Sequence, residues 1–256
     1  ENWRNLISVG AKPLAITNCL NFGNPENQEI MGEFAECLEG VKEACNFLNY
    51  PVVSGNVSFY NGTNKKNIYP TPVIGGVGLI KKLSNPVSHN FKKINSSIIL
   101  IGKTFGHIEQ SCFLRENYSI TEGMPPEINL LNEKNNGESL LKLIDKNLIL
   151  SAHDISSGGL ITALAEMALT SNYGAKINKP KKLTNIFKYF FGEDQARYIV
   201  EIQTQNLPMV EKILKENNVY YENIGVTQEN YFEIEGELKI STKDLFKINN
   251  QWYNNY

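Results

Sequence analysis

The residues of this sequence best suited to chemistry form the run Ser54–Ser58, directly after the apolar segment Pro51–Val53. The apolar segment predicts a strand, and α/β proteins usually bind ligands at the carboxyl ends of their strands. Gly55 would let a ligand approach the backbone, Asn56 offers a carbonyl oxygen suited to Mg²⁺, and Ser58 shares a strand face with Asn56. The run predicts a ligand site, and the alternative is a polar turn without a ligand.

A second polar run, Thr17–Glu26, also follows an apolar strand pattern and contains a Gly turn. Its Asn18 and Asn21 side chains suit phosphate or a metal ion, and an Asx-turn is the alternative. Cys19 has the chemistry of a nucleophile, but no His lies near it in the sequence to activate it. We therefore assign no catalytic residue in this run.

A third run, Ser151–Gly159, joins a predicted strand to a predicted helix. Asp154, Gly158 and Gly159 lie where a helix N-terminus could bind an anion, and where Asp154 could bind Mg²⁺ or cap the helix. His153 is either a general base or a structural residue.

A fourth run, Gly192–Arg197, contains Glu193 and Gln195 and precedes a predicted strand. It could bind a polar ligand or form a solvated turn. The glycines of Pro72–Lys81 do not form a dinucleotide fingerprint, because Lys81 stands at the position of the third Gly and no helix follows. No P-loop motif occurs either.

These runs lie between alternating helical and extended patterns. The segment Glu29–Leu48 has apolar residues every three or four positions, which predicts an amphipathic helix. Further helices are predicted at 138–145, 160–169 and 209–216, and strands at 13–17, 51–54, 71–80, 98–101, 148–150, 198–202, 224–227 and 231–234. This mixture predicts an α/β or α+β class.

The composition narrows the class of protein. The 256 residues include 25 Lys and Arg against 27 Asp and Glu, a net charge of −2, which argues against a nucleic-acid binder. The longest aliphatic run, Ile98–Ile101, is far shorter than the roughly 20 residues of a membrane helix. The four cysteines form no C-x-x-C pair, so reduced thiols are expected. The first residue is not Met, which suggests a fragment or a processed chain.

Together the runs resemble one family, the large synthetase subunit of phosphoribosylformylglycinamidine synthase. The motifs that carry the resemblance are Ala15–Glu26, Pro51–Asn61, Tyr69–Val73, Ser151–Gly159 and Gly192–Arg197. That family contains two copies of a unit shared with aminoimidazole ribonucleotide synthetase, each an ATP-binding α/β domain followed by an α+β domain. This chain resembles the C-terminal copy.

The resemblance implies two domains, part of an ATP-binding domain at 1–85 and an α+β domain at 96–256, with the polar segment Lys81–Ser97 as the linker. The family uses ATP and glutamine-derived ammonia to convert formylglycinamide ribonucleotide to formylglycinamidine ribonucleotide in purine biosynthesis. It is a carbon–nitrogen ligase, with ATP as substrate and Mg²⁺ as cofactor.

By resemblance, Gly55 contacts ATP, Asn56 binds Mg²⁺ and Ser58 contacts the substrate. Asn18 lies where many relatives have an Asp that faces ATP, and an amide is a weaker Mg²⁺ ligand than a carboxylate.

In the second domain, the resemblance leaves two readings open for Asp154, Gly158, Gly159, Glu193 and Gln195. They form either an auxiliary nucleotide site or only part of the fold.

The resemblance also implies the partners. The family's catalytic His lies in the N-terminal copy, so the isolated chain is expected to be inactive. Expected partners are the N-terminal half of the subunit, a glutaminase subunit, a small bridging subunit and, through the sheet, a second copy of the chain, all in the cytoplasm. The alternatives are a non-catalytic nucleotide-binding or assembly module, or another enzyme of the superfamily.

Overall fold

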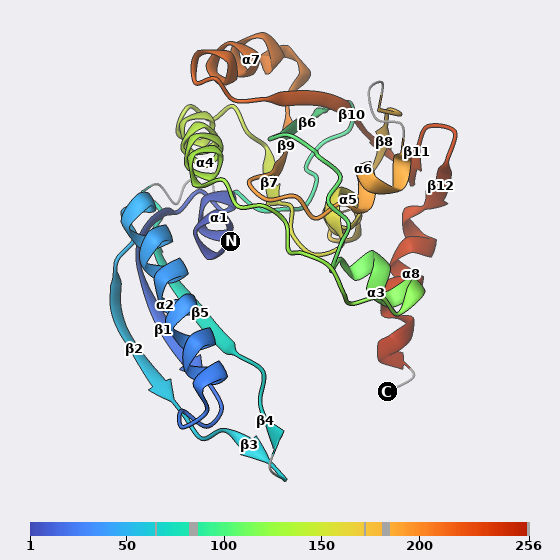
Figure 1. Ribbon diagram of the computed structural model, residues 1–256. Coiled ribbons are helices and arrows are strands. Elements are labelled where there is room, and N and C mark those ends of the chain that lie inside the picture. Colours follow the sequence, from blue (N-terminus) through green and yellow to red (C-terminus); the bar gives the residue numbers. More distant parts are fainter. Residues whose placement is uncertain (65, 82–86, 172, 181–184, 255–256) are drawn as a thin grey trace. The chain divides into compact units, whose positions relative to one another are not determined.

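The structure is a computed structural model that describes residues 1–64, 66–81, 87–171, 173–180 and 185–254 (Figure 1). It divides into two compact units. The N-terminal unit contains Asn2 and Ala11–Lys81, and the C-terminal unit contains Glu1, Trp3–Gly10 and the described residues after position 86. Among the described residues, no helix is both long enough and apolar enough to cross a bilayer. Positions 82–86 of the predicted linker lie outside the described residues.

The N-terminal unit is a three-stranded sheet with one long helix. The strand order is β2 (Val52–Ser58), β1 (Lys12–Asn21) and β5 (Thr71–Leu79), with β1 parallel to β2 and antiparallel to β5. Helix α2 (Gln28–Leu48) lies along this sheet, and a small hairpin of β3 (Gly62–Thr63) and β4 (Lys66–Asn67) follows β2 (Figure 1).

Helix α2 begins where its sequence predicts. The Asn27 side chain accepts a hydrogen bond from the Glu29 N–H, and the helix ends at Asn49 in the left-handed region (φ 52°). Its apolar residues pack on one face of the sheet, in a cluster of Leu20, Phe22, Ile30, Phe34, Cys37 and Phe59. Because side chains alternate along a strand, the strand residues between the members of this cluster face the opposite side of the sheet, away from α2. The described residues leave that face largely open.

The C-terminal unit is built on a seven-stranded sheet in the order β12-β11-β8-β10-β6-β9-β7. The strands are β6 (Ser97–Ile101), β7 (Ser151–Asp154), β8 (Tyr173–Ile177), β9 (Tyr198–Ile202), β10 (Tyr221–Glu229), β11 (Tyr231–Ile234) and β12 (Leu238–Ser241). All neighbours are antiparallel except β8 and β11.

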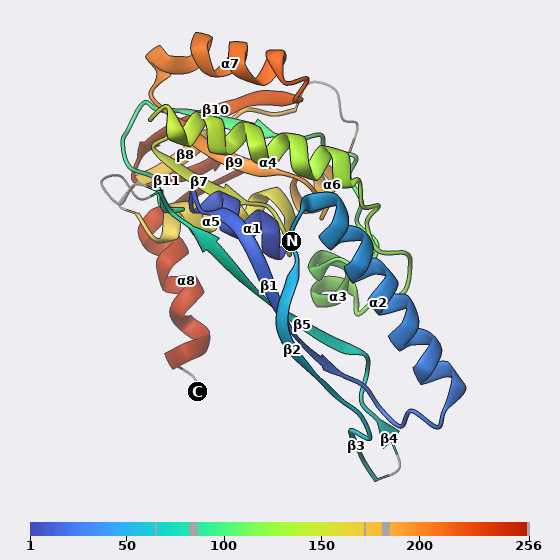
Figure 2. The same cartoon turned by 90° about the vertical axis from the view of Figure 1, so that its left-hand side faces the viewer.

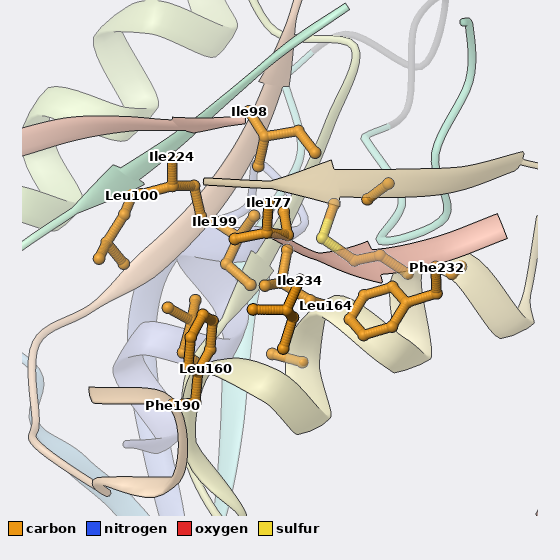
Figure 3. Close-up of a cluster of buried hydrophobic side chains, with 14 of the residues drawn as sticks. Ile98, Leu100, Leu160, Leu164, Ile177, Phe190, Ile199, Ile224, Phe232 and Ile234 are labelled. Atoms are coloured by element: carbon orange, nitrogen blue, oxygen red, sulfur yellow. The ribbon is translucent and has the colours of Figure 1, made fainter. Parts of the chain in front are cut away.

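The helices of this unit are α1 (Asn2–Ser8, of which all but Asn2 belong here), α3 (Cys112–Tyr118), α4 (Leu130–Asp145), α5 (Gly159–Leu169), α6 (Ile186–Phe191), α7 (Leu207–Glu216) and α8 (Thr242–Asn254), with a 3₁₀ turn at Thr204–Asn206. Helices α4 and α7 lie on one face of the sheet and α5 on the other (Figure 2). Figure 3 shows Leu160 and Leu164 of α5 directed toward the sheet residues Ile98, Ile177 and Ile199. Strand β6 is buried on both faces, which explains its uninterrupted apolar sequence.

Several predicted boundaries are wrong in ways that have physical causes. The strand predicted at 13–17 runs to Asn21, because Asn21 keeps its pairing with Ser58 and Thr71. Residues 148–150 are not a strand, and pairing with β9 begins instead at Ser151. Helix α4 starts at Leu130 rather than at 138, because the Asn129 side chain accepts from the Asn132 N–H and caps it.

Candidate functional site

The open face of the N-terminal sheet carries a shallow cavity of about 450 Å³. It is lined by Thr17, Asn18, Cys19, Ser54, Gly55, Asn56, Val73 and Gly75. Strand pairing gathers these residues, because Cys19 is opposite both Asn56 and Val73 in the register. Ser54, Gly55 and Asn56 of the predicted run therefore face solvent beside a cavity, rather than an apolar interior.

Gly55 and Asn18 are directly paired, and their contact explains the glycine. A Cβ atom on Gly55 would lie 1.9 Å from Asn18 Oδ1 and 2.6 Å from the Asn18 carbonyl oxygen. The Asn18 amide therefore occupies the space over Gly55. By strand alternation this is the side of the sheet that α2 covers, opposite to the side chain of Asn56. The structure does not bring the Asn18 and Asn56 side chains onto one face.

Asn56 lies on the open face and its side chain is exposed. The oxygen donors around it belong to amides and hydroxyls, and none of the residues that line the cavity is a carboxylate. Within the described ranges, no group of three or more His, Cys, Asp or Glu is arranged to hold a metal. This donor set fits Mg²⁺ only when a ligand such as a polyphosphate supplies most of the oxygens.

Ser58 ends strand β2 and is half-buried, next to the cavity rather than in its lining. Its hydroxyl contacts the side chain of Asn61, a residue that was not among the predicted site residues. Cys19 lies on the open face, and its sulfur accepts a hydrogen bond from Asn21 Nδ2 at 3.4 Å. The three histidines of the chain all follow position 86, so the N-terminal unit offers Cys19 no imidazole base.

The Asp154 run forms an ionic cluster in the C-terminal unit. His153 contacts Asp154 Oδ1 through Nδ1 at 3.3 Å and Glu166 Oε2 through Nε2 at 3.0 Å. Burial lowers the pKa of His153, but hydrogen bonds to the two carboxylates outweigh it and raise the pKa to about 9. Burial opposes ionisation of Asp154, yet His153 and Arg4 hold its pKa below the usual value. His153 is therefore a cation in an ion pair, which favours the structural reading over a general base.

Gly158 and Gly159 start helix α5, and both have positive φ angles (79° and 72°). The N-terminus of α5 already has an anion, because Glu193 Oε1 accepts the Gly158 N–H at 2.8 Å. The same oxygen accepts the Cys112 N–H at 2.8 Å, so Glu193 joins the starts of α3 and α5. A phosphate at this end of α5 would have to displace the Glu193 carboxylate.

Gln195 accepts a hydrogen bond from Arg4, a residue that the sequence did not mark as important. The Arg4 guanidinium donates to Gln195 Oε1 at 2.6 Å, to the Ile155 carbonyl at 2.9 Å and to both oxygens of Glu133, at 2.8 and 3.0 Å. Arg4 and Glu133 are both buried. Gln195 also lines a second cavity of about 290 Å³ with Phe105, His107, Glu127, Asn129, Asn132, Asp194 and Ala196.

Two further buried carboxylates organise loops of the C-terminal unit. Asp194 accepts the N–H groups of three consecutive residues, Phe105 to His107, at 2.9–3.1 Å. Glu201 accepts the N–H groups of Lys92 and Lys93 at 2.8 and 3.0 Å, and burial raises its pKa. Both carboxylates are satisfied by the chain itself, which gives them a role in the fold.

Comparisons with known proteins identify relatives along the whole chain. Residues 1–80 match AIR synthase related protein, N-terminal domain, and residues 93–235 match AIR synthase related protein, C-terminal domain. The phosphoribosylformylglycinamidine synthase subunit PurL of Pelagibacter ubique (strain HTCC1062) is 54% identical over 256 residues, and that of Rhodopseudomonas palustris (strain TIE-1) is 44% identical. Each alignment covers all of this chain and 35% of the relative, so the chain spans about a third of the length of these curated relatives.

Solved structures share the fold. The structure titled T. maritima PurL complexed with FGAR matches with a TM-score of 0.74 and 17% identity, over 95% of this chain and 41% of that chain. A chain from a HypE–HypF complex matches with a TM-score of 0.68 and 15% identity, over 91% of this chain and 78% of that chain. The comparisons confirm the resemblance drawn from the motifs and the mixed α/β, α+β fold class.

Proposed function

This chain belongs to the AIR synthase related protein family, and on that premise we propose that it is one part of a phosphoribosylformylglycinamidine synthase synthetase subunit. The observation that carries the proposal is its 54% identity, over its full length, with a curated subunit of that enzyme. The exposure of Gly55 and Asn56 beside a cavity, with Ser58 half-buried next to them, supports it, because a binding residue must be accessible to its ligand. The reaction would be the ATP-dependent conversion of formylglycinamide ribonucleotide and ammonia to formylglycinamidine ribonucleotide.

We propose that the open sheet face meets the phosphorylated ligands. Gly55 would present its backbone to ATP, and Ser58 would contact the ribonucleotide substrate. Asn56 would supply one oxygen ligand to Mg²⁺, and the phosphates would supply others. Bound there, the ion would neutralise phosphate charge during phosphoryl transfer. Asn18 would act through its contact with Gly55, holding β1 and β2 together beneath the ligand.

For the C-terminal unit we propose that the predicted auxiliary residues serve the fold. Asp154 pairs with His153, Glu193 caps the start of α5, and Gln195 binds Arg4. Each polar group then has an internal partner and none is needed for a nucleotide. We propose domains at 1–85 and 96–256. Helix α1 lies within the first of these ranges but packs in the C-terminal unit.

We propose that the site is completed by the rest of the subunit, since the chain spans about a third of its relatives' length. A glutaminase and a small bridging subunit would supply ammonia, and a solved T. maritima assembly is titled PurLQS. The uncovered sheet face could also pair with a second copy of the chain. The cytoplasm, where nucleotides are made, is the proposed location.

A chimera tests the function. This chain would replace the matching residues of the P. ubique subunit, and amidine formation would be measured with ATP and ammonium chloride, which removes the need for a glutaminase. We expect the chimera to be active and the isolated chain to be inactive. Asn56→Ala should lower the chimera's activity about tenfold or more, through loss of a metal ligand. The exposed Asn46→Ala in α2 is the matched control.

Two results would argue against the proposal. Turnover by the isolated chain at the chimera's rate would show that no other part is needed. A folded chimera that binds ATP without forming the amidine would favour the non-catalytic nucleotide-binding module instead.

A further inference from the structure

The hydroxyl of Ser58 lies against the side-chain amide of Asn61. Asn61 Nδ2 donates to Ser58 Oγ at 3.1 Å, and Ser58 Oγ donates to Asn61 Oδ1 at 3.3 Å. Both polar atoms of the amide therefore face the same hydroxyl. A serine side chain without such partners exchanges among three staggered rotamers. The amide of Asn61 holds this one in a single orientation.

Asn61 is itself fixed from several directions. Its Nδ2 also donates to the carbonyl oxygens of Ser58 and Phe22, both at 3.0 Å, so that its two hydrogens are shared among three acceptors. Its backbone N–H donates to Phe22 at 3.3 Å, and its carbonyl accepts from the Ile68 N–H at 3.2 Å. These bonds join the ends of β1 and β2 to the β3–β4 hairpin. The amide that orients Ser58 is thus a rigid part of the sheet edge.

The turn between the two residues is strained. Tyr60 has φ 60°, a left-handed conformation that is unfavourable for an aromatic residue. It is held there by its N–H, which donates to the Gly23 carbonyl at 2.9 Å, while the preceding Phe59 ring packs against Phe34 at 5.1 Å. This geometry turns the chain so that Asn61 returns to Ser58.

The backbone alone already closes this turn, because the Phe22 N–H donates to the Ser58 carbonyl at 2.9 Å and Tyr60 bonds Gly23. The amide–hydroxyl pair is an addition that closure does not require. We infer that Asn61 is a positioning residue that orients the Ser58 hydroxyl for the ribonucleotide substrate. The identity of that ligand rests on the proposed function, whereas the orientation of the hydroxyl does not.

Crystal structures of the chain test the orientation without any assay of activity. We expect Ser58 to occupy one rotamer in the unsubstituted chain and in N46A, and more than one in N61A. If N61A does not fold, N61L, which keeps the approximate size of the side chain but removes both the donor and the acceptor that contact Ser58, takes its place. A single, unchanged Ser58 rotamer in the Asn61 variant would overturn the inference.

Kinetics of the chimera test the consequence. N61A should raise the KM for formylglycinamide ribonucleotide about threefold to tenfold, because the hydroxyl is no longer pre-oriented, and should leave the KM for ATP unchanged. Since Asn61 acts through Ser58, S58A/N61A should equal S58A alone, and N46A should equal the parent. Effects of S58A and N61A that multiply would overturn the inference. An inactive parent chimera counts against the proposed function, and the Ser58 rotamers then decide the inference alone.

Discussion

The ion pair of His153 should make the stability of the C-terminal unit depend on pH in the alkaline range. The imidazole contacts Asp154 and Glu166 at 3.3 and 3.0 Å, and its pKa is raised from 6.5 to about 9. A group whose pKa is higher in the folded state stabilises that state when protonated. The stabilisation is complete below pH 6.5 and is lost as the pH rises through 9.

The structure sets the size of this effect. At 1.36 kcal/mol per pH unit, the interval from pH 6.5 to about 9 corresponds to about 3 kcal/mol. The Glu166 side chain is 51% exposed, so water screens its share of the interaction. We therefore expect His153→Gln to remove about 1–2 kcal/mol of unfolding free energy at pH 6, and almost none at pH 10.

Urea unfolding at pH 6 and pH 10 measures this difference. Fluorescence of Trp3 reports on the C-terminal unit, because Trp3 is buried in that unit against Gly137, whereas Trp252 is exposed. Glu166→Gln should lose part of the pH dependence, and Glu138→Gln, an exposed residue on α4, should keep it. The reasoning is refuted if His153→Gln has the same pH dependence as the unsubstituted chain, or if NMR titration places the pKa of His153 near 6.5.

Three other substitutions test the packing. Gly55→Ala should lower the free energy of unfolding by about 1–3 kcal/mol, because the added Cβ would meet the neighbouring backbone. Gly40→Ala, at a position on α2 with open space around it, should raise the free energy of unfolding by about 0.5–1 kcal/mol. Urea unfolding of both variants measures the difference. Glu133→Ala should lower the free energy of unfolding by about 3–5 kcal/mol, because the buried Arg4 guanidinium loses its paired carboxylate, and a loss below 1 kcal/mol would contradict this. Glu193→Ala should cost about 1–3 kcal/mol and speed hydrogen exchange at the two amides it accepts, while unchanged exchange would argue against capping.

Local pattern was enough to predict the elements with strong periodicity. Helix α2, the buried strand β6 and helix α5 are close to their predicted bounds, because each carries an apolar pattern that matches its burial. Strand β8 was missed because its pattern is weak. It contains Gly174, where a Cβ would lie 1.7 Å from the Tyr231 carbonyl oxygen of β11. The need for glycine at this position is therefore set by a strand more than fifty residues away in the sequence.

In the candidate site too, features set by neighbouring residues could be predicted, and contacts between distant residues could not. Residues Gly55–Ser58 are contiguous in sequence, so local pattern was enough to group them, although the strand predicted at 51–54 continues through them to Ser58. The partners that fix the other predicted residues are distant. Gln195 meets Arg4 across 191 positions, and Glu133 meets Arg4 across 129. A single sequence gives no signal that connects such positions.

The Arg4 contacts bear on how the chain can be divided in the laboratory. A fragment that begins after position 86 would lack α1. Glu133, Gln195 and the Ile155 carbonyl would then have lost the Arg4 guanidinium that donates to them. Expressed by itself, such a fragment should be poorly folded, and a synthetic peptide of the first ten residues should restore it. The C-terminal unit is therefore built from two separate stretches of the chain, α1 and the residues after position 86, and both must be present for it to fold.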